Sequence, residues 1–448
     1  MTDPSPGPAA QPEDILYGEQ TRLALDNFRI SALTLPPAFI HALGLIKAAA
    51  ARANGRLGEL PADMAEAIAL AADEVAVGHH DGQFGVDVFQ TGSGTSTHMN
   101  ANEVIATLAA RRLGREAHPN DHVNRGQSSN DVIPSAIHVS AARGLQKLKD
   151  ALATLAATLE GLAQQYHGVV KTGRTHLMDA APLTLGQEIS GWAAQVRNDH
   201  ARLADVEPRL LQLAVGGTAV GTGLNAHPRL ALETTAELAR CTGLEFRPAA
   251  NAFAAISSQD TAIELSGQLR VTAATLAKIA GDLRWMNSGP VAGLGEIRLK
   301  ALQPGSSIMP GKVNPVIPEA VSMVCAQVVG CDAAIAASAW DNRFQLATML
   351  PLVAYNLNLE IALLTGAARA LDERALRDME VDVDSLRRHV ERNAMLATAL
   401  TPRIGYERAG AIARRAVDEG RTVLEVALEE TDIPGEELKR LLDPVGMV

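Results

Sequence analysis

The segment from Gly305 to Pro315, GSSIMPGKVNP, gathers hydroxyl, amide and ammonium groups in one short stretch. Ser306 and Ser307 follow one glycine, and Lys312 and Asn314 follow another. Hydroxyl and amide donors beside an ammonium are the groups that bind a carboxylate. A polar connector with a solvated lysine has the same composition, so composition alone leaves both interpretations open.

Three other segments have a similar polar character. In Gln127 to Asp131 (QSSND), serine, asparagine and aspartate can cap a following helix, whose free N–H groups favour an anion. Capping alone would also explain these residues. Thr91 to Thr97 (TGSGTST) could hold an anion, but it matches no phosphate-binding fingerprint. Gly216 to Gly223 (GGTAVGTG) lacks the glycine order and the following Lys-Ser/Thr of nucleotide-binding loops, so we predict no nucleotide site there.

Two of the histidine-containing segments could carry chemistry. His118 and His122 are four residues apart with Asp121 between them, but the intervening proline and asparagine disfavour a helical ligand pair. No third strong ligand is evident, and we predict no metal site. His176 lies in a polar turn, Gly173 to Asp179, before an apolar segment. Taken alone, a histidine in such a turn is more often structural than catalytic.

The elements that must position these segments are predicted to be long helices. Hydrophobic residues make up 47% of the chain but aromatic residues only 3%, which favours helices over strands. Apolar residues recur every three or four positions in three stretches, as in long helices that pack at shallow angles. The stripes are Leu145, Leu148, Leu152, Leu155, Leu159 and Leu162; Ile189, Trp192, Val196, Leu203, Val206 and Leu210; and Leu265, Leu269, Leu276, Ile279, Leu283 and Met286.

Composition also limits the partners of this 448-residue chain. A formal net charge of −11 argues against nucleic acid or an anionic membrane as the main partner. The three cysteines are too few for a disulfide framework and suit a reducing compartment. Ala320 to Trp340 is apolar enough to span a bilayer, but the amphipathic segments around it favour the centre of a helical bundle. We expect a soluble, cytoplasmic protein with no secretory leader in its polar, proline-rich first residues.

A change in composition after Leu371 indicates a separate C-terminal part. We predict a disordered terminus over residues 1–13 and an N-terminal domain with substrate-binding loops over residues 14–134. A central long-helix domain with the Ser306 loop would cover residues 135–372, and a small helical domain residues 373–448.

Taken together, the polar segments resemble one family. GSSIMPGKVNP is the signature of the fumarase/aspartase superfamily. HPNDHVNRGQSSND, GRTHLMDAAPLTLGQE, GGTAVGTGLN and TGSGTSTHMNANEV are also similar to class II fumarase motifs and follow their order. YGEQTRLALDNF and TALTPRIGYERA extend the resemblance from about Leu16 to the end of the chain.

The resemblance implies a mostly α-helical, three-domain subunit with an L-aspartase-like fold and a long central helical bundle. It also implies a homotetramer in which each active site collects loops from three subunits. The family catalyses reversible anti addition of water or an amine across fumarate without a cofactor. Such chemistry needs a base for a weakly acidic C–H proton, stabilisation of the resulting dianion, and an acid for the leaving group.

By resemblance, Ser306 is the base, and Lys312 and Asn314 bind the carboxylate that gains charge. His176 handles water or hydroxide on the opposite face, with Glu319 as its orienting partner. The same resemblance places the remaining substrate-binding residues at Ser93, Gly94, Thr95, Arg115, Ser128, Ser129, Asn130, Thr175, Ser307 and Val313. It places a secondary anion site at His118, Pro119, Asn120 and Asp121.

Within the superfamily, His176 favours hydration of fumarate to L-malate, a step of the tricarboxylic acid cycle. Aspartases typically carry glutamine there, and an imidazole exchanges protons with water near neutral pH whereas an amide does not. Two positions depart from the family pattern, His98 for the usual asparagine and Met178 for a common glutamine, and neither has an assigned chemical role. The alternatives are an aspartate ammonia-lyase, another fumarate-releasing lyase, or a non-catalytic scaffold like the lens crystallins related to argininosuccinate lyase.

Overall fold

The computed structural model describes residues 15–448, and the terminus predicted to be disordered lies outside this range. Its contacts divide the chain into two compact units. The first unit comprises residues up to 149, 201–273 and 326–365, and the second comprises 150–200, 274–325 and 366–448. The three predicted domain boundaries therefore stay a prediction. The long helices that contribute residues to both units are α5 (Ser129–Gln165), α6 (Leu185–Leu210), α9 (Asp260–Met286), α10 (Val316–Ser338) and α11 (Leu350–Ala370).

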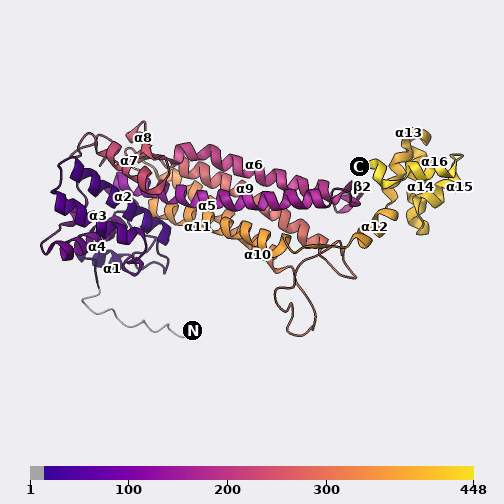
Figure 1. The fold of residues 1–448 in the computed structure, drawn as a ribbon, viewed down its shortest axis with the longest axis horizontal. Coiled ribbons are helices and arrows are strands. Elements are labelled where there is room, and N and C mark those ends of the chain that lie inside the picture. Colours follow the sequence, from indigo (N-terminus) through magenta and orange to yellow (C-terminus); the bar gives the residue numbers. More distant parts are fainter. Residues whose placement is uncertain (1–14) are drawn as a thin grey trace. The chain divides into compact units, whose positions relative to one another are not determined.

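The first unit contains a group of short and medium helices, mostly from the N-terminal part of the chain (Figure 1). Helices α2 and α3 pack closely because Gly44 has no side chain: a Cβ there would lie 2.6 Å from the Ala76 nitrogen. The helices of this unit are α1 (Glu19–Asn27), α2 (Pro37–Arg56), α3 (Ala62–Ala76), η1 (Asp81–Gln83), α4 (Thr95–Leu113), η2 (Pro119–Val123), α7 (Leu230–Thr242), α8 (Ala252–Ser257) and η3 (Ala339–Asp341). Its parallel strand pair is β3 (Gln212–Leu213) with β4 (Arg247–Pro248).

The second unit contains an antiparallel hairpin, β1 (Val170–Thr175) with β2 (Met178–Thr184), and a short strand pair, β5 (Ile297–Arg298) with β6 (Glu380–Val381). Short helices at the C-terminal end enclose an apolar core that includes Leu400, Ile412, Val426 and Leu438 (Figure 1). The remaining elements of this unit are η4 (Leu371–Leu376), α12 (Val383–Glu391), η5 (Ala394–Leu400), α13 (Thr401–Ile404), α14 (Tyr406–Glu419), α15 (Val423–Glu430), α16 (Gly435–Leu441) and η6 (Pro444–Met447).

The mostly helical fold class is confirmed. Each of the three predicted apolar stripes lies on one long helix, α5, α6 or α9, and all of its members are buried. Two of the polar segments belong in part to regular secondary structure. Helix α4 begins at Thr95, where Gln90 Oε1 accepts a hydrogen bond from the Thr97 backbone N–H, and Lys171 to Asp179 belongs to the β1–β2 hairpin.

Within residues 15–448, two stretches are long and apolar enough to cross a membrane by composition, Val316–Asp341 and Leu350–Leu376. In the single chain, 61% of the apolar window in the second stretch is buried, which is typical of a core helix. The window in the first stretch is only 33% buried, and Met323 and Val329 of α10 are exposed. Helix α10 thus buries one apolar face, with Val321, Val328 and Ile335, and leaves another uncovered by this chain.

A buried polar cluster interrupts the apolar interior of the first unit. Ser266 Oγ of α9 lies 2.8 Å from Asp332 Oδ1 of α10 and 3.1 Å from Glu360 Oε1 of α11. Arg270 donates to the other Asp332 oxygen at 2.8 Å. Burial raises the pKa of Glu360 to about 9. Ser266 has one hydroxyl proton and can donate it to only one of the two carboxyl groups. Both contacts are satisfied if Ser266 donates to Asp332 and a neutral, protonated Glu360 donates to Ser266 Oγ.

We expect Glu360→Gln to increase the free energy of unfolding, and the gain to grow from pH 5 to pH 8.5. Folded Glu360 keeps its proton up to about pH 9, whereas the unfolded carboxyl loses it above its usual pKa, so wild-type stability falls as pH rises through this window. The slope for one such group is about 1.4 kcal/mol per pH unit. Thermal unfolding at several pH values measures it. A gain that is equal at pH 5 and pH 8.5 would contradict a neutral Glu360.

Candidate active site

In the first unit, the two hydroxyl-rich segments lie together at the N-termini of α4 and α5. Ser93 Oγ and Thr95 Oγ1 are 2.9 Å apart at the start of α4, and Ser129 begins α5. Gly94 has a φ of 72°, and a Cβ there would lie 3.0 Å from the Ile133 side chain of α5. Two long helices therefore direct free backbone N–H groups and hydroxyls to one place, which suits a carboxylate.

The carboxylate of Asp131 fixes the second of these segments. Its Oδ1 accepts the Ser128 N–H at 2.9 Å, and its Oδ2 accepts the N–H groups of Gly216 and Thr218, both at 2.9 Å. Asp131 is fully buried, and this burial raises its pKa to about 6 although the three N–H bonds act in the opposite direction. The GGTAVGTG segment thus serves to position the QSSND segment, and Asn130 also donates to the Ala219 carbonyl at 2.8 Å.

A buried lysine lies beneath the same segment. Lys47 Nζ of α2 donates to Asn124 Oδ1 and Gln127 Oε1 at 3.0 Å each. Burial lowers the pKa of Lys47 to about 7, while the charge of Asp131 raises it. The Lys47 side chain therefore joins α2 to the turn before α5 through two neutral acceptors.

In the second unit, the Gly305–Pro315 segment folds back on itself. The Gly305 N–H donates to the Lys312 carbonyl at 2.9 Å, and a Cβ on Gly305 would lie 2.3 Å from that oxygen. Ser306 Oγ accepts the N–H groups of Ile308 and Met309 at 3.2 and 3.1 Å. Hydrogen bonds to a hydroxyl oxygen favour its deprotonated form. Lys312 Nζ donates to Asn314 Oδ1 at 2.7 Å, and Asn314 Nδ2 donates to the Gly305 carbonyl at 2.8 Å.

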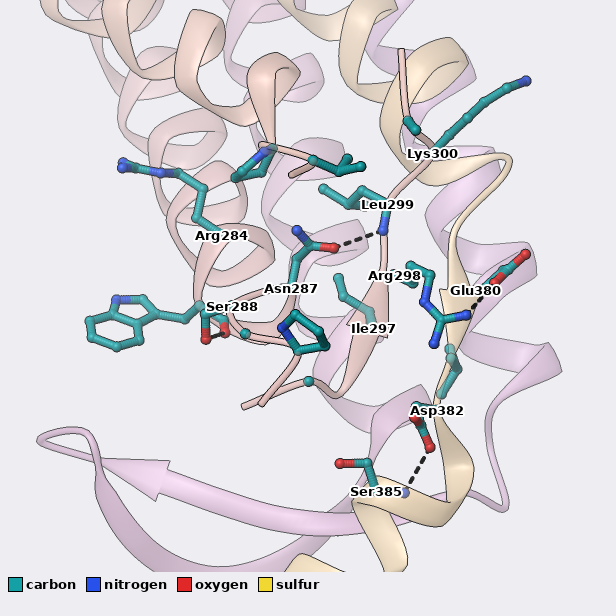
Figure 2. Close-up of a pocket in the computed structure, with 18 of the residues that line it drawn as sticks. Arg284, Asn287, Ser288, Ile297, Arg298, Leu299, Lys300, Glu380, Asp382 and Ser385 are labelled. Carbon is teal, nitrogen blue, oxygen red and sulfur yellow. Dashed lines mark hydrogen bonds and ion pairs between the residues drawn. The ribbon is translucent and has the colours of Figure 1, made fainter. Parts of the chain in front are cut away.

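An open cavity of about 1620 Å³ lies beside this segment in the second unit (Figure 2). Lys312, Val313, Asn314 and Glu319 line it. Figure 2 shows three contacts within another part of the cavity lining. Asn287 accepts the Leu299 N–H at 2.8 Å, and Arg298 pairs with Glu380 at 3.4 Å. Asp382 accepts the Ser385 N–H at 2.8 Å. The cavity therefore gives space and both signs of charge next to Lys312 and Asn314.

His176 and Leu177 form the two-residue turn of the β1–β2 hairpin, with φ values of 56° and 62°. Both side chains are exposed, as is that of Thr175. A buried ionic network anchors the base of the hairpin. Lys171 Nζ contacts Glu188 and Glu296 at 2.5 and 2.9 Å, and Arg174 lies 2.6 Å from Glu296, whose side chain is completely buried.

The structure thus forms two separate groups of predicted site residues. Ser93, Gly94, Thr95, Ser128, Ser129 and Asn130 lie together in the first unit, and Ser306, Ser307, Lys312, Val313 and Asn314 lie in one folded segment of the second. In the described part of the second unit, no hydrogen bond or ion pair joins His176 to Glu319.

Residues predicted for a secondary anion site are engaged with one another. His118 Nδ1 accepts the N–H groups of Asn120 and Asp121 at 3.3 and 3.1 Å, and the His118 N–H donates to His122 Nδ1 at 2.8 Å. Arg115 pairs with Asp63 at 2.5 Å. The secondary site stays a prediction. Within residues 15–448, no group of three or more His, Cys, Asp or Glu side chains is arranged to hold a metal ion.

Several positioning residues escaped the sequence analysis, chiefly Lys47, Asp131 and Glu296. Lys47 did leave a signal, because it is a single charge inside the apolar run of α2. Asp131 was noted only as a possible helix cap, and Glu296 lay in none of the polar segments, since their partners are backbone N–H groups or distant side chains.

Comparison with known proteins identifies the family of the chain. A family model described as a lyase matches residues 7–330, and one for the fumarase C C-terminus matches residues 396–448. Fumarate hydratase class II 2 of Pseudomonas aeruginosa is 56% identical over 98% of this chain and 96% of its own, and fumarate hydratase class II of Xylella fastidiosa is 52% identical over 99% and 94%.

Solved structures show the same likeness over nearly the whole chain. The class II fumarase of Schistosoma mansoni has a TM-score of 0.94 and 36% identity, with coverage of 98% of this chain and 96% of that one. A cobalt-bound fumarate lyase:delta crystallin of Brucella melitensis has a TM-score of 0.92 and 44% identity, with the same coverage. Sequence motifs, helical fold and full-length similarity together establish that the chain belongs to the class II fumarase family.

Proposed function

We propose that the protein is a fumarate hydratase that interconverts fumarate and L-malate by anti addition of water, with Ser306 as the carbon-proton base. The observation that carries the assignment of the base is the pair of N–H groups, from Ile308 and Met309, on Ser306 Oγ. These bonds stabilise an alkoxide, which a serine needs in order to remove a weakly acidic proton.

In the dehydration direction, Ser306 removes the proton from the carbon next to one carboxylate of L-malate. That carboxylate becomes a dianionic aci-carboxylate, and Lys312 and Asn314 stabilise it from the adjoining segment. His176, oriented by Glu319, gives a proton to the departing hydroxyl on the opposite face, so that water leaves. The other carboxylate is held by the hydroxyls and helix N-termini at Ser93–Thr95 and Ser128–Asn130.

The complete site assembles in a homotetramer, with loops from three subunits. Two features support this: among residues 15–448 no hydrogen bond or ion pair joins His176 to the Ser306 segment, and α10 leaves Met323 and Val329 exposed. A stable interface would bury such an apolar helix face. The proposal includes a cytoplasmic location, which suits three free cysteines, and a role in the tricarboxylic acid cycle, which contains this reaction.

Ultraviolet absorption of fumarate tests the proposed reaction. Purified protein mixed with L-malate should produce fumarate rapidly, and protein mixed with L-aspartate should produce none. Fumarate formed from L-aspartate alone would instead identify an ammonia-lyase, and the choice of a hydratase on the basis of His176 would be wrong. No signal with either substrate would leave a non-catalytic scaffold or a larger substrate.

We expect Ser306→Ala to reduce kcat for L-malate by about a hundredfold to ten-thousandfold, the usual contribution of a general base. The matched control is Ser288→Ala, since Ser288 Oγ also accepts a loop N–H, that of Leu294 at 3.0 Å, and has no assigned part in the chemistry. Ser288→Ala should keep most of the activity. Gel filtration and binding of succinate, an unreactive dicarboxylate, show whether each variant retains its assembly. Full activity of Ser306→Ala would assign the base elsewhere.

We expect His176→Asn to reduce kcat at least about a hundredfold without loss of the hairpin, because asparagine accepts the positive φ of this turn but exchanges no proton near neutral pH. The same change at the adjacent turn position, Leu177→Asn, is the control and should retain activity. Steady-state rates with L-malate and circular dichroism measure both. Equal rates in the two variants would remove His176 from the acid role.

A further inference from the structure

His98 lies in the interior of the first unit, directly behind the predicted carboxylate-binding residues. Its side chain is on α4 and is 1% exposed. His98 Nδ1 is 2.8 Å from Ser129 Oγ, at the first residue of α5. His98 Nε2 has no hydrogen-bond partner among residues 15–448. One ring nitrogen therefore contacts the Ser129 hydroxyl, and the other makes no hydrogen bond to the described residues.

The surroundings of His98 keep its ring neutral. Burial, together with the positive charge of Lys47, holds the pKa of His98 well below its usual value. A neutral imidazole carries one N–H, which can lie on either ring nitrogen. The hydrogen-bond pattern must then decide which nitrogen it occupies.

The two tautomers differ in what they leave unpaired. If the proton were on Nε2, a buried N–H donor would have no acceptor, which is rare in proteins. If the proton is on Nδ1, only an acceptor lone pair of Nε2 is unpaired, and Nδ1–H donates to Ser129 Oγ. We assign the second tautomer on this ground. The Ser129 hydroxyl proton is then directed away from His98 and remains available to another acceptor.

We propose that His98 is a positioning residue that directs the Ser129 hydroxyl proton toward a carboxylate of the substrate. The inference rests on the proposed function, which places the substrate carboxylate at the N-termini of α4 and α5. It gives a role to a position where the chain departs from the family pattern. Asparagine, which the family usually carries there, also has an N–H donor that can serve Ser129.

A set of variants tests this role through KM and kcat for L-malate. His98→Leu removes the donor while filling similar space, and we expect KM to rise about tenfold with kcat changed less than about threefold, because the lost bond acts on binding rather than on chemistry. His98→Asn should restore KM to within about threefold of the wild type. In a Ser129→Ala background, His98→Leu should raise KM no further, since the two residues then act as one unit.

Asn102→Leu is the matched control for loss of a buried polar group from α4. Among the described residues, the Asn102 side-chain amide makes one hydrogen bond, to the Met99 sulfur at 3.5 Å. Asn102 lies outside the proposed site. This variant should keep the wild-type KM even if its melting temperature falls. Melting temperatures of all variants separate a binding defect from unfolding.

Three results would overturn the inference: an unchanged KM in His98→Leu, an equal further rise in KM in the Ser129→Ala background, or no rescue by His98→Asn. The test is separate from that of the proposed function, which depends on wild-type turnover alone. If the wild type processed only L-aspartate, the same comparison would use L-aspartate, which also carries two carboxylates. If it processed neither, calorimetric titration with fumarate would supply dissociation constants in place of KM.

Discussion

The buried carboxylate of Asp131 is the constraint on which the first half of the site depends. It holds together two segments more than eighty residues apart in sequence by accepting three backbone N–H groups. The bond from Ser128 satisfies an amide at the start of α5 that the helix itself cannot satisfy. Without this carboxylate, the N–H groups of Ser128, Gly216 and Thr218 would lose their acceptor. The bond of Asn130 to the Ala219 carbonyl would still join the two turns.

In the second unit, a buried carboxylate again fixes predicted site residues, but its partners are charged side chains instead of backbone amides. Glu296, fully buried, accepts both Lys171 and Arg174 and so anchors the hairpin that carries His176. Removal of one partner from a buried ionic group leaves an uncompensated charge, which is strongly destabilising. In both units, therefore, predicted site residues stand on short turns or at helix starts, and buried charged side chains with no assigned chemical role fix the geometry there.

The sequence was sufficient to predict the helical class and the family, because apolar periodicity is local and the motifs are long. It also singled out Ser306, Lys312 and His176 as candidates, since each lies in a recognisable polar segment. It was insufficient for the residues that position them. The bond of Asp131 to Gly216 and the contact of Lys171 with Glu296 join positions far apart in the chain, and neither leaves a spacing that can be read. The hairpin was missed because its strands are short and polar at the tip, so they resemble a loop in composition.

The turn at His176 and Leu177 has a further consequence for protein engineering. Two consecutive non-glycine residues at positive φ store conformational strain, and an Asn-Gly pair would relieve it in this class of turn. A search for thermostable variants guided by backbone preference alone would therefore select replacement of the imidazole at an early stage. This strain lowers the stability of the fold, and the proposed acid role of His176 gives a reason for the cost. Backbone strain in an otherwise regular hairpin is thus a signal of function that can be recognised without any knowledge of the reaction.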